Sequence, residues 1–218
     1  AVYCAKISST GTQDWFVFGL GDELSPYISV LHDESSIYIG LNTLLTRDFS
    51  GNDVSIQGTS TGPVIVALES ATGNQSWIKY SNAGLSPNVA LCNLAQTDTT
   101  IYTVGVVDVL DGEYTDFNGE VHSVNLNGFC ALTASLQKKN GSQNWQVIGG
   151  SPEPDFSRQI EVDSEGSVIT FCLAGSSPFS CGGFEQEIVG RRTSLIMKIS
   201  KDGVVAWVVS AGGDGLNY

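Results

Sequence analysis

The residues best suited to chemistry gather in one acidic loop near the middle of the chain. That loop carries one of the two histidines and five carboxylates: His122, Asp108, Asp111, Glu113, Asp116 and Glu120. An imidazole beside a carboxylate is a pairing used in general-base catalysis and in metal binding. The spacing lacks the twelve-residue ligand pattern of an EF-hand, so we expect a solvated acidic loop, with a Ca²⁺ site as the alternative.

The rest of the sequence offers little catalytic machinery. His32 falls in a predicted turn and is interpreted as a turn residue. No Gly-x-Ser-x-Gly elbow, HExxH motif or phosphate-binding glycine loop occurs, and the cysteines form no CxxC pair. We therefore predict no catalytic residues and no resident metal, and we expect the protein not to be an enzyme.

Composition excludes two further classes. The chain has 218 residues with 10 Lys+Arg against 23 Asp+Glu, giving a net charge of -13, and 41 % of its residues are hydrophobic. That apolar content is enough to build a core, which excludes a disordered polyanion. Ten scattered cations do not form the basic patch that nucleic-acid binding needs. The apolar stretches are too short to predict a membrane-spanning segment.

Four tryptophans set the organisation of the chain. Trp15, Trp77, Trp145 and Trp207 are 62, 68 and 62 residues apart, and a glycine stands four residues before each of them. This pattern predicts a recurring hairpin: a strand, a turn with glycine at a positive φ, and a strand carrying the tryptophan. We interpret each tryptophan as a structural contact between neighbouring repeats.

A second predicted hairpin follows each of the first three tryptophans, which gives four short strands in each repeat of about 65 residues. Four strands with a recurring tryptophan are typical of a β-propeller blade. We therefore predict an all-β fold and a single β-propeller segment with repeats at 1–62, 63–128, 129–194 and, in part, 195–218. This amounts to about three and a half four-stranded blades. We expect an incomplete ring, a segment of a larger and perhaps seven-bladed propeller.

Several segments resemble known propeller repeats. Gly73-Asn74-Gln75-Ser76-Trp77, Asp116-Phe117 and Ile160–Gly166 resemble the secreted β-propeller repeats called SBBP repeats. The segment Ala67–Trp77 also resembles the tryptophan-docking motif of quinoprotein propellers. The resemblance covers the whole chain in degenerate form, and it implies the fold far more than the activity.

The cysteines and the glycosylation sequons indicate the cellular location of the protein. Cys172 and Cys181 enclose a short loop, and we predict a disulfide between them; Cys4 and Cys130 are expected to be reduced, buried and at equivalent repeat positions. Asn74 and Asn140 each begin an acceptor sequon, and both fall in the same predicted hairpin turn of successive repeats. We therefore expect a glycosylated protein that is extracellular or lies at the cell surface.

Function is predicted from the long loops 45–62, 110–128 and 176–194, which are expected to share one face. Long loops on a rigid scaffold tend to carry binding sites. The candidates on that face are Asp111, Asp116, Phe117 and Phe184. We expect a non-catalytic structural or protein-interaction module, with partners that are other chains or the remainder of its own chain, and possibly glycans. A quinoprotein-type enzyme and a glycan-binding lectin are the alternatives.

Overall fold

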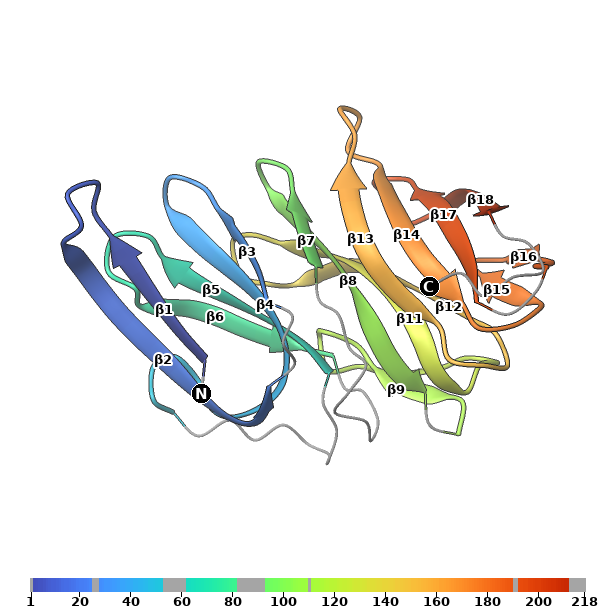
Figure 1. Cartoon of the computed structure of the whole chain (residues 1–218), viewed down its shortest axis with the longest axis horizontal. Helices are drawn as coiled ribbons and strands as arrows, with labels where there is room; N and C mark the ends of the chain where they lie inside the picture. The colour runs from blue at the N-terminus through green and yellow to red at the C-terminus, as the bar shows by residue number, and fades with distance from the viewer. Residues whose placement is uncertain are drawn as a thin grey trace.

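The computed structural model describes residues 2–24, 28–52, 62–81, 93–109, 111–189 and 192–211. Within these ranges the chain forms strands and no helix, so the predicted all-β class is confirmed (Figure 1). No helix in this part of the chain is long and apolar enough to cross a lipid bilayer.

The strands follow one pattern along the chain. A hairpin comes first, with β1 (Val2–Ile7) and β2 (Gln13–Leu24). Three antiparallel meanders of four strands follow, here called the first, second and third units. The first unit contains β3 (Ser29–His32), β4 (Ser36–Arg47), β5 (Gly62–Glu69) and β6 (Gln75–Tyr80). The second contains β7 (Asn93–Gln96), β8 (Thr100–Val109), β11 (Gly128–Gln137) and β12 (Gln143–Gly150). The third contains β13 (Phe156–Val162), β14 (Val168–Ala174), β17 (Thr193–Ile199) and β18 (Val205–Ala211).

The sheets do not all have the four strands expected of uniform blades. The described sheets contain six, two, six and four strands, and none closes on itself. One six-stranded sheet arises because the ends of β2 and β4 run past their own hairpins and pair with each other. The other arises because β15 (Phe179–Cys181) pairs with β12 and with β16 (Phe184–Gln186). The hairpin of β9 (Glu113–Thr115) and β10 (Val121–Ser123) forms the two-stranded sheet.

Strand register separates two ends of each unit. In the first unit Ser36 pairs with Glu69 at one end and Thr43 with Gly62 at the other. The second and third units have the same register, so their tight turns lie at one end and their long connections begin at the other. We call these ends the turn edge and the loop edge. In Figure 1 the β3–β4, β7–β8 and β13–β14 turns lie along the upper side, and β9 lies along the lower side.

Apolar side chains pack the β1–β2 hairpin and the three units face to face in three clusters. The inward faces of β1 and β2 pack on the first unit, the first unit packs on the second, and the second packs on the third. The third unit shows the expected period of two, since β14 alternates between buried and less buried positions. Strand β8 is buried on nearly every residue because it lies between two packed sheets.

Trp15, Trp77 and Trp145 form one recurring junction, which joins the β1–β2 hairpin to the first unit and then each unit to the next. The indole N–H groups of Trp15, Trp77 and Trp145 donate to backbone carbonyls of the next unit's hairpin turn, at 3.1, 2.8 and 2.7 Å. The accepting residues are Ser70, Lys138 and Lys201, in that order. Each ring lies over the glycine of that turn, so a Cβ added at Gly73, Gly141 or Gly203 would come within 2.6–2.7 Å of the indole. We call this contact the Trp–Gly junction.

Candidate functional site

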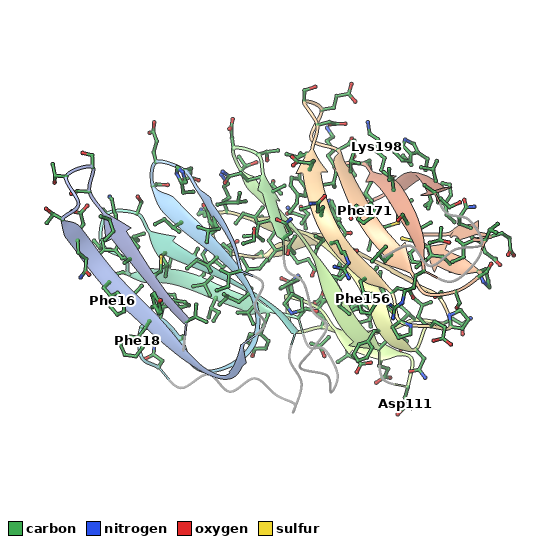
Figure 2. All side chains as sticks on the ribbon, viewed as in Figure 1. Phe16, Phe18, Asp111, Phe156, Phe171 and Lys198 are labelled. Atoms are coloured by element: carbon green, nitrogen blue, oxygen red, sulfur yellow. The ribbon has the colours of Figure 1, made fainter. Side chains whose placement is uncertain are left out.

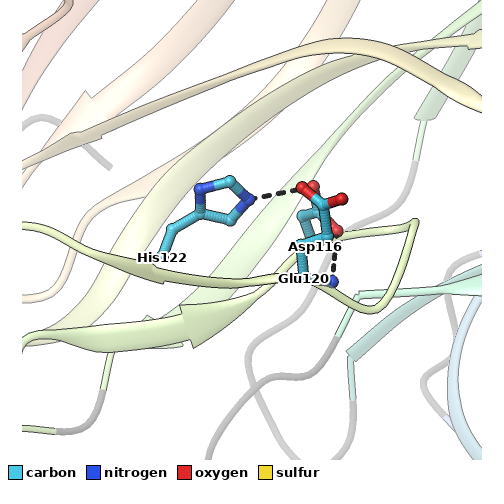
Figure 3. Close-up of side chains that lie close together, drawn as sticks. All are labelled: Asp116, Glu120 and His122. Atoms are coloured by element: carbon cyan, nitrogen blue, oxygen red, sulfur yellow. Dashed lines mark hydrogen bonds and ion pairs between the residues drawn. The ribbon is translucent and has the colours of Figure 1, made fainter.

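The acidic loop folds into a hairpin around one buried carboxylate. Asp116, at the end of β9, is 2 % exposed, and its Oδ1 accepts from the backbone N–H groups of Asn118 and Glu120, both at 2.9 Å. Its Oδ2 lies 3.0 Å from His122 Nε2 and accepts from Gln143 Nε2 at 2.9 Å. Figure 3 shows the His122 ring directed at this carboxylate. Four groups therefore surround the two oxygens of Asp116.

A second copy of this arrangement lies one unit earlier. Asp48 is 6 % exposed, and its Oδ1 accepts from the backbone N–H groups of Ser50 and Asn52. Its Oδ2 accepts from the side chains of Asn52 and Gln75, at 3.2 and 3.0 Å. Burial raises the pKa of Asp48, but the hydrogen bonds from Asn52, Gln75 and Ser50 outweigh it and lower the pKa overall. The shared part is an Asp-Phe-x-Gly turn with a glutamine 27 residues after the aspartate.

The glutamine completes the turn in both copies. Gln143 Oε1 accepts from the backbone N–H of Phe117, and Gln75 Oε1 accepts from that of Phe49, both at 3.1 Å. One amide thus satisfies a carboxylate oxygen and a backbone N–H together. We call each set an Asp–Gln lock, and it ties a long connection to the start of the last strand of its unit, β6 or β12. Our sequence reasoning missed both glutamines, although the repeated Asp-Phe-x-Gly spacing carried the signal.

Comparison of the two locks indicates whether the cluster around His122 needs a metal ion. Asp116, Glu120 and His122 bring one ligand atom each to within 4.8 Å of one another, as a metal site requires. However, Asn52 stands in the first lock where Glu120 stands in the second, and the lock forms there all the same. His122 also stacks on Tyr114, with ring centroids 5.2 Å apart. The geometry therefore fits a turn lock that needs no ion.

The four predicted contact residues separate into two groups. Asp116 and Phe117 are each 2 % exposed, and Phe117 packs in the cluster between the first and second units. Their side chains are not available to a partner, because the lock turns both of them inward. Asp111 and Phe184 stay at the surface, and Figure 2 shows Asp111 at the tip of the loop edge.

Asp111 and Phe184 line two adjoining hollows at the loop edge of the second unit. The larger hollow has a volume of about 770 Å³ and is lined by Asp111, Pro152, Pro178 and the 124–128 segment, among others. The smaller hollow is about 350 Å³ and includes Phe184. Residues 124–126 and Ser180 line both. The structure thus brings two predicted residues, 73 positions apart in the sequence, to the same surface.

A buried carboxylate holds Ser151, one of the residues that line the larger hollow. Asp155 is 0 % exposed and accepts from the backbone N–H of Ser151, from Ser151 Oγ at 2.9 Å and from the backbone N–H of Gly175 at 2.9 Å. Burial raises the pKa of Asp155 to about 6, and the hydrogen bonds from Gly175 and Ser151 only partly oppose it. Asp155 therefore holds residues 151–155 against the connection after β14.

The described cysteines are all free, so the structure does not contain the predicted disulfide. Cys172 lies inside β14, where its Sγ is 3.0 Å from Ser157 Oγ, and Cys181 lies on β15 of a different sheet. Cys4 and Cys130 are not equivalent as expected. Cys4 lies two positions before Lys6, which pairs with Trp15. Cys130 lies five positions before Ser135, which pairs with Trp145. Only Cys130 is buried, and Cys4 is partly exposed. Cys92 lies outside the described residues.

The two sequons lie where an acceptor can be reached. Asn74 and Asn140 are exposed in the equivalent β5–β6 and β11–β12 turns on the turn edge, one directly after the turn glycine and the other directly before it. His32 ends β3, and its carbonyl accepts from Gln96 Nε2 at 3.0 Å, which fits the expected turn role. No protein-family model matches the chain, and no curated protein sequence matches it. Functional conclusions therefore rest on the residues and geometry given above.

Proposed function

We propose that the chain is a segment of a β-propeller and serves as a non-catalytic extracellular or cell-surface module for structure and protein interaction. The threefold Trp–Gly junction carries this proposal. It joins successive four-strand meanders with their tight turns along one edge, and this repetition supports the proposed blade arrangement. A rigid stack of this kind is suited to holding long connections in fixed positions.

The loop edge is the surface proposed for binding. Its larger hollow combines polar groups from Asn125, Asn127 and Ser151 with apolar walls from Leu126 and Pro152. A volume of about 770 Å³ lies in the range of known ligand sites, which span roughly 300–1,000 Å³. We infer that a projecting loop of a partner protein enters it, contacting Asp111 in this hollow and Phe184 in the adjoining smaller one.

Two features support a role without catalysis outside the cell. Asp116, the carboxylate paired with His122, is committed to its lock, and the buried Asp155 is shielded from a substrate. Asn74 and Asn140 are exposed in equivalent turns, away from the loop edge, so glycans there would leave the proposed binding surface open.

The test compares binding to an array of extracellular proteins between wild type and an Asp111→Ala/Phe184→Ala variant. An Asn74→Gln/Asn140→Gln variant is the matched control at the turn edge. Partners of the wild-type chain should be lost by the loop-edge variant and kept by the control. Loss in the control alone would place binding at the turn edge and contradict the proposal. Quinone absorbance in the purified protein would contradict a non-catalytic role.

Glycosylation of the two sequons has a separate test. Expressed with a secretion signal in a glycosylating host, the chain should lose mass on endoglycosidase treatment, and Asn74→Gln and Asn140→Gln should each remove one glycan. An unmodified secreted chain would contradict the interpretation of both sequons.

A further inference from the structure

Two apolar sheet faces at opposite ends of the described chain lack the cover that their counterparts have. Tyr3 pairs with the residue three positions after Trp15. Val64, Leu132 and Leu195 each pair with the residue three positions after their own tryptophan, so they are the equivalents of Tyr3. Those three are 0 % exposed because each packs on the preceding sheet, whereas Tyr3 is 72 % exposed. Ile7, Phe16 and Phe18 on the same side of the β1–β2 hairpin are 49–57 % exposed. We call these four residues the head face.

The opposite face belongs to the third unit. Trp207 is 37 % exposed, whereas the equivalent Trp15 is 9 % exposed. Val209 is 50 % exposed, but Val147, also two residues after its tryptophan, is 8 % exposed. Ile196 pairs with both Val209 and Phe171, so these side chains share one side of the sheet with Trp207. We call this set, with Ile169, the tail face; Figure 2 shows Phe171 and Lys198 there and Phe16 and Phe18 at the far end.

The head hairpin also carries an empty acceptor for a tryptophan. A Cβ added at Gly11 would meet nothing within 4 Å, although Gly73, Gly141 and Gly203 each lie under an indole ring. The Ser8–Gly11 turn has the same hydrogen bond as the Ser200–Gly203 turn, with glycine N–H donating to serine carbonyl at 3.0 and 2.9 Å. In the latter turn, the residue after the serine supplies the carbonyl that accepts from Trp145. Ser9 has the matching place.

We propose that the tail face of one copy of this chain packs on the head face of a second copy. Trp207 would lie over Gly11 of that copy and donate its indole N–H to the carbonyl of Ser9. A second copy is inferred from the three internal junctions. In each of them, a face that carries a tryptophan packs on a hairpin that carries the turn glycine, as the tail face would pack on the head face. The proposal rests on the proposed repeat architecture, but it uses surfaces separate from the loop edge.

The contact is heterologous, because two different surfaces meet. Such contacts either close into a ring or extend into an open chain of subunits. Burying apolar surface drives the association, and the aromatic residues of both faces belong to the types that dominate interface energetics. A single substitution on either face should therefore weaken every contact in the assembly, since each contact needs one head and one tail.

The experiment measures the mass of the purified 218-residue chain by sedimentation velocity over a wide concentration range. Wild type should associate as concentration rises. Phe18→Asp on the head face and Trp207→Asp on the tail face should each weaken association more than about thirtyfold. Val209→Asp serves as a second tail variant, and circular dichroism checks that each variant keeps its strand content. Val121→Asp, at a 65 % exposed position on β10, and the loop-edge variant Asp111→Ala should associate like wild type.

Mixing the two variants gives the decisive result. Phe18→Asp keeps an intact tail and Trp207→Asp keeps an intact head, so the mixture should form a one-to-one dimer that grows no further. A wild-type chain that stays monomeric at every concentration would overturn the proposal. So would variants that still associate alone, or folded variants whose mixture stays monomeric. None of these outcomes would affect partner binding at the loop edge, so the two proposals fail independently.

Discussion

A methyl group added at two glycines should separate the strain of a turn from the energy of a Trp–Gly junction. Gly141 and Gly11 have similar positive φ values, +70° and +82°, in equivalent hairpin turns. Replacing either by alanine forces a Cβ into the left-handed region, at a cost of about 1–2 kcal/mol of unfolding free energy. This part of the effect is common to both variants.

Only Gly141→Ala also disturbs a junction. Its Cβ would lie 2.7 Å from Trp77 Cε3 and 2.7 Å from Lys79 Cγ, whereas the Cβ at Gly11 would meet nothing within 4 Å. The indole cannot simply shift, because its N–H is bound to the Lys138 carbonyl at 2.8 Å. Overpacking of this kind costs about 1–3 kcal/mol, so Gly141→Ala should lose that much more stability than Gly11→Ala.

Urea unfolding followed by circular dichroism measures both losses, at a concentration low enough to keep the chain monomeric. Gly73→Ala repeats the test at the preceding junction, with its Cβ 2.7 Å from Trp15 Cε3. Equal losses at positions 11 and 141 would refute the reasoning, because the Trp–Gly contact would then contribute nothing beyond turn geometry.

Three further predictions concern polar contacts. Gln143→Ala and Gln75→Ala should each lower the unfolding free energy by about 1–3 kcal/mol in urea titrations, since each leaves a buried lock unsatisfied; the exposed Gln137→Ala should change little, and a loss as large there would refute the lock. Asp155 has a folded pKa of about 6 against an ordinary 3.8, so its contribution to stability is full below pH 3.8 and is lost as pH rises through 6. Stability measured from pH 3 to 8 should therefore show a decline worth up to about 3 kcal/mol that Asp155→Asn abolishes, and an unchanged decline in the variant would contradict the assignment. Burial raises the pKa of Asp33, but hydrogen bonds from Lys138, Ser35 and Ser36 lower it to about 2. Lys138→Met should therefore raise the pKa of Asp33 in an NMR titration, whereas Lys139→Met should leave it unchanged. An unaltered Asp33 pKa in Lys138→Met would contradict the ion pair.

Local patterns predicted the strands well because they depend on neighbours in sequence. The glycine four residues before each tryptophan correctly indicated a hairpin, since a turn with positive φ favours glycine whatever surrounds it. The alternation in β14 likewise follows from one buried sheet face. These features need no knowledge of which sheet lies opposite.

Contacts between distant segments were harder to predict. Asp116 and Phe117 belong to a conspicuous acidic loop, yet both point inward, because Gln143 lies 27 residues later and completes their turn. The extra pairing of β2 with β4 and of β12 with β15 depends on where strands end, which periodicity does not define. The cysteine alignment was wrong for a different reason: Cys4 stands eleven residues before Trp15 and Cys130 fifteen residues before Trp145, so the spacing in the sequence already separated them.

Hydrogen exchange of the four indole N–H groups tests the repeated junction most directly. By NMR of the monomeric chain, the indole protons of Trp15, Trp77 and Trp145 should exchange slowly, because each is bound to a carbonyl of the next unit. That of Trp207 should exchange fastest, since no junction among the described residues covers it, and it should slow as the chain associates. A Trp207 proton as protected as the others in the monomer, or a Trp77 proton exchanging as fast as that of Trp207, would contradict the account.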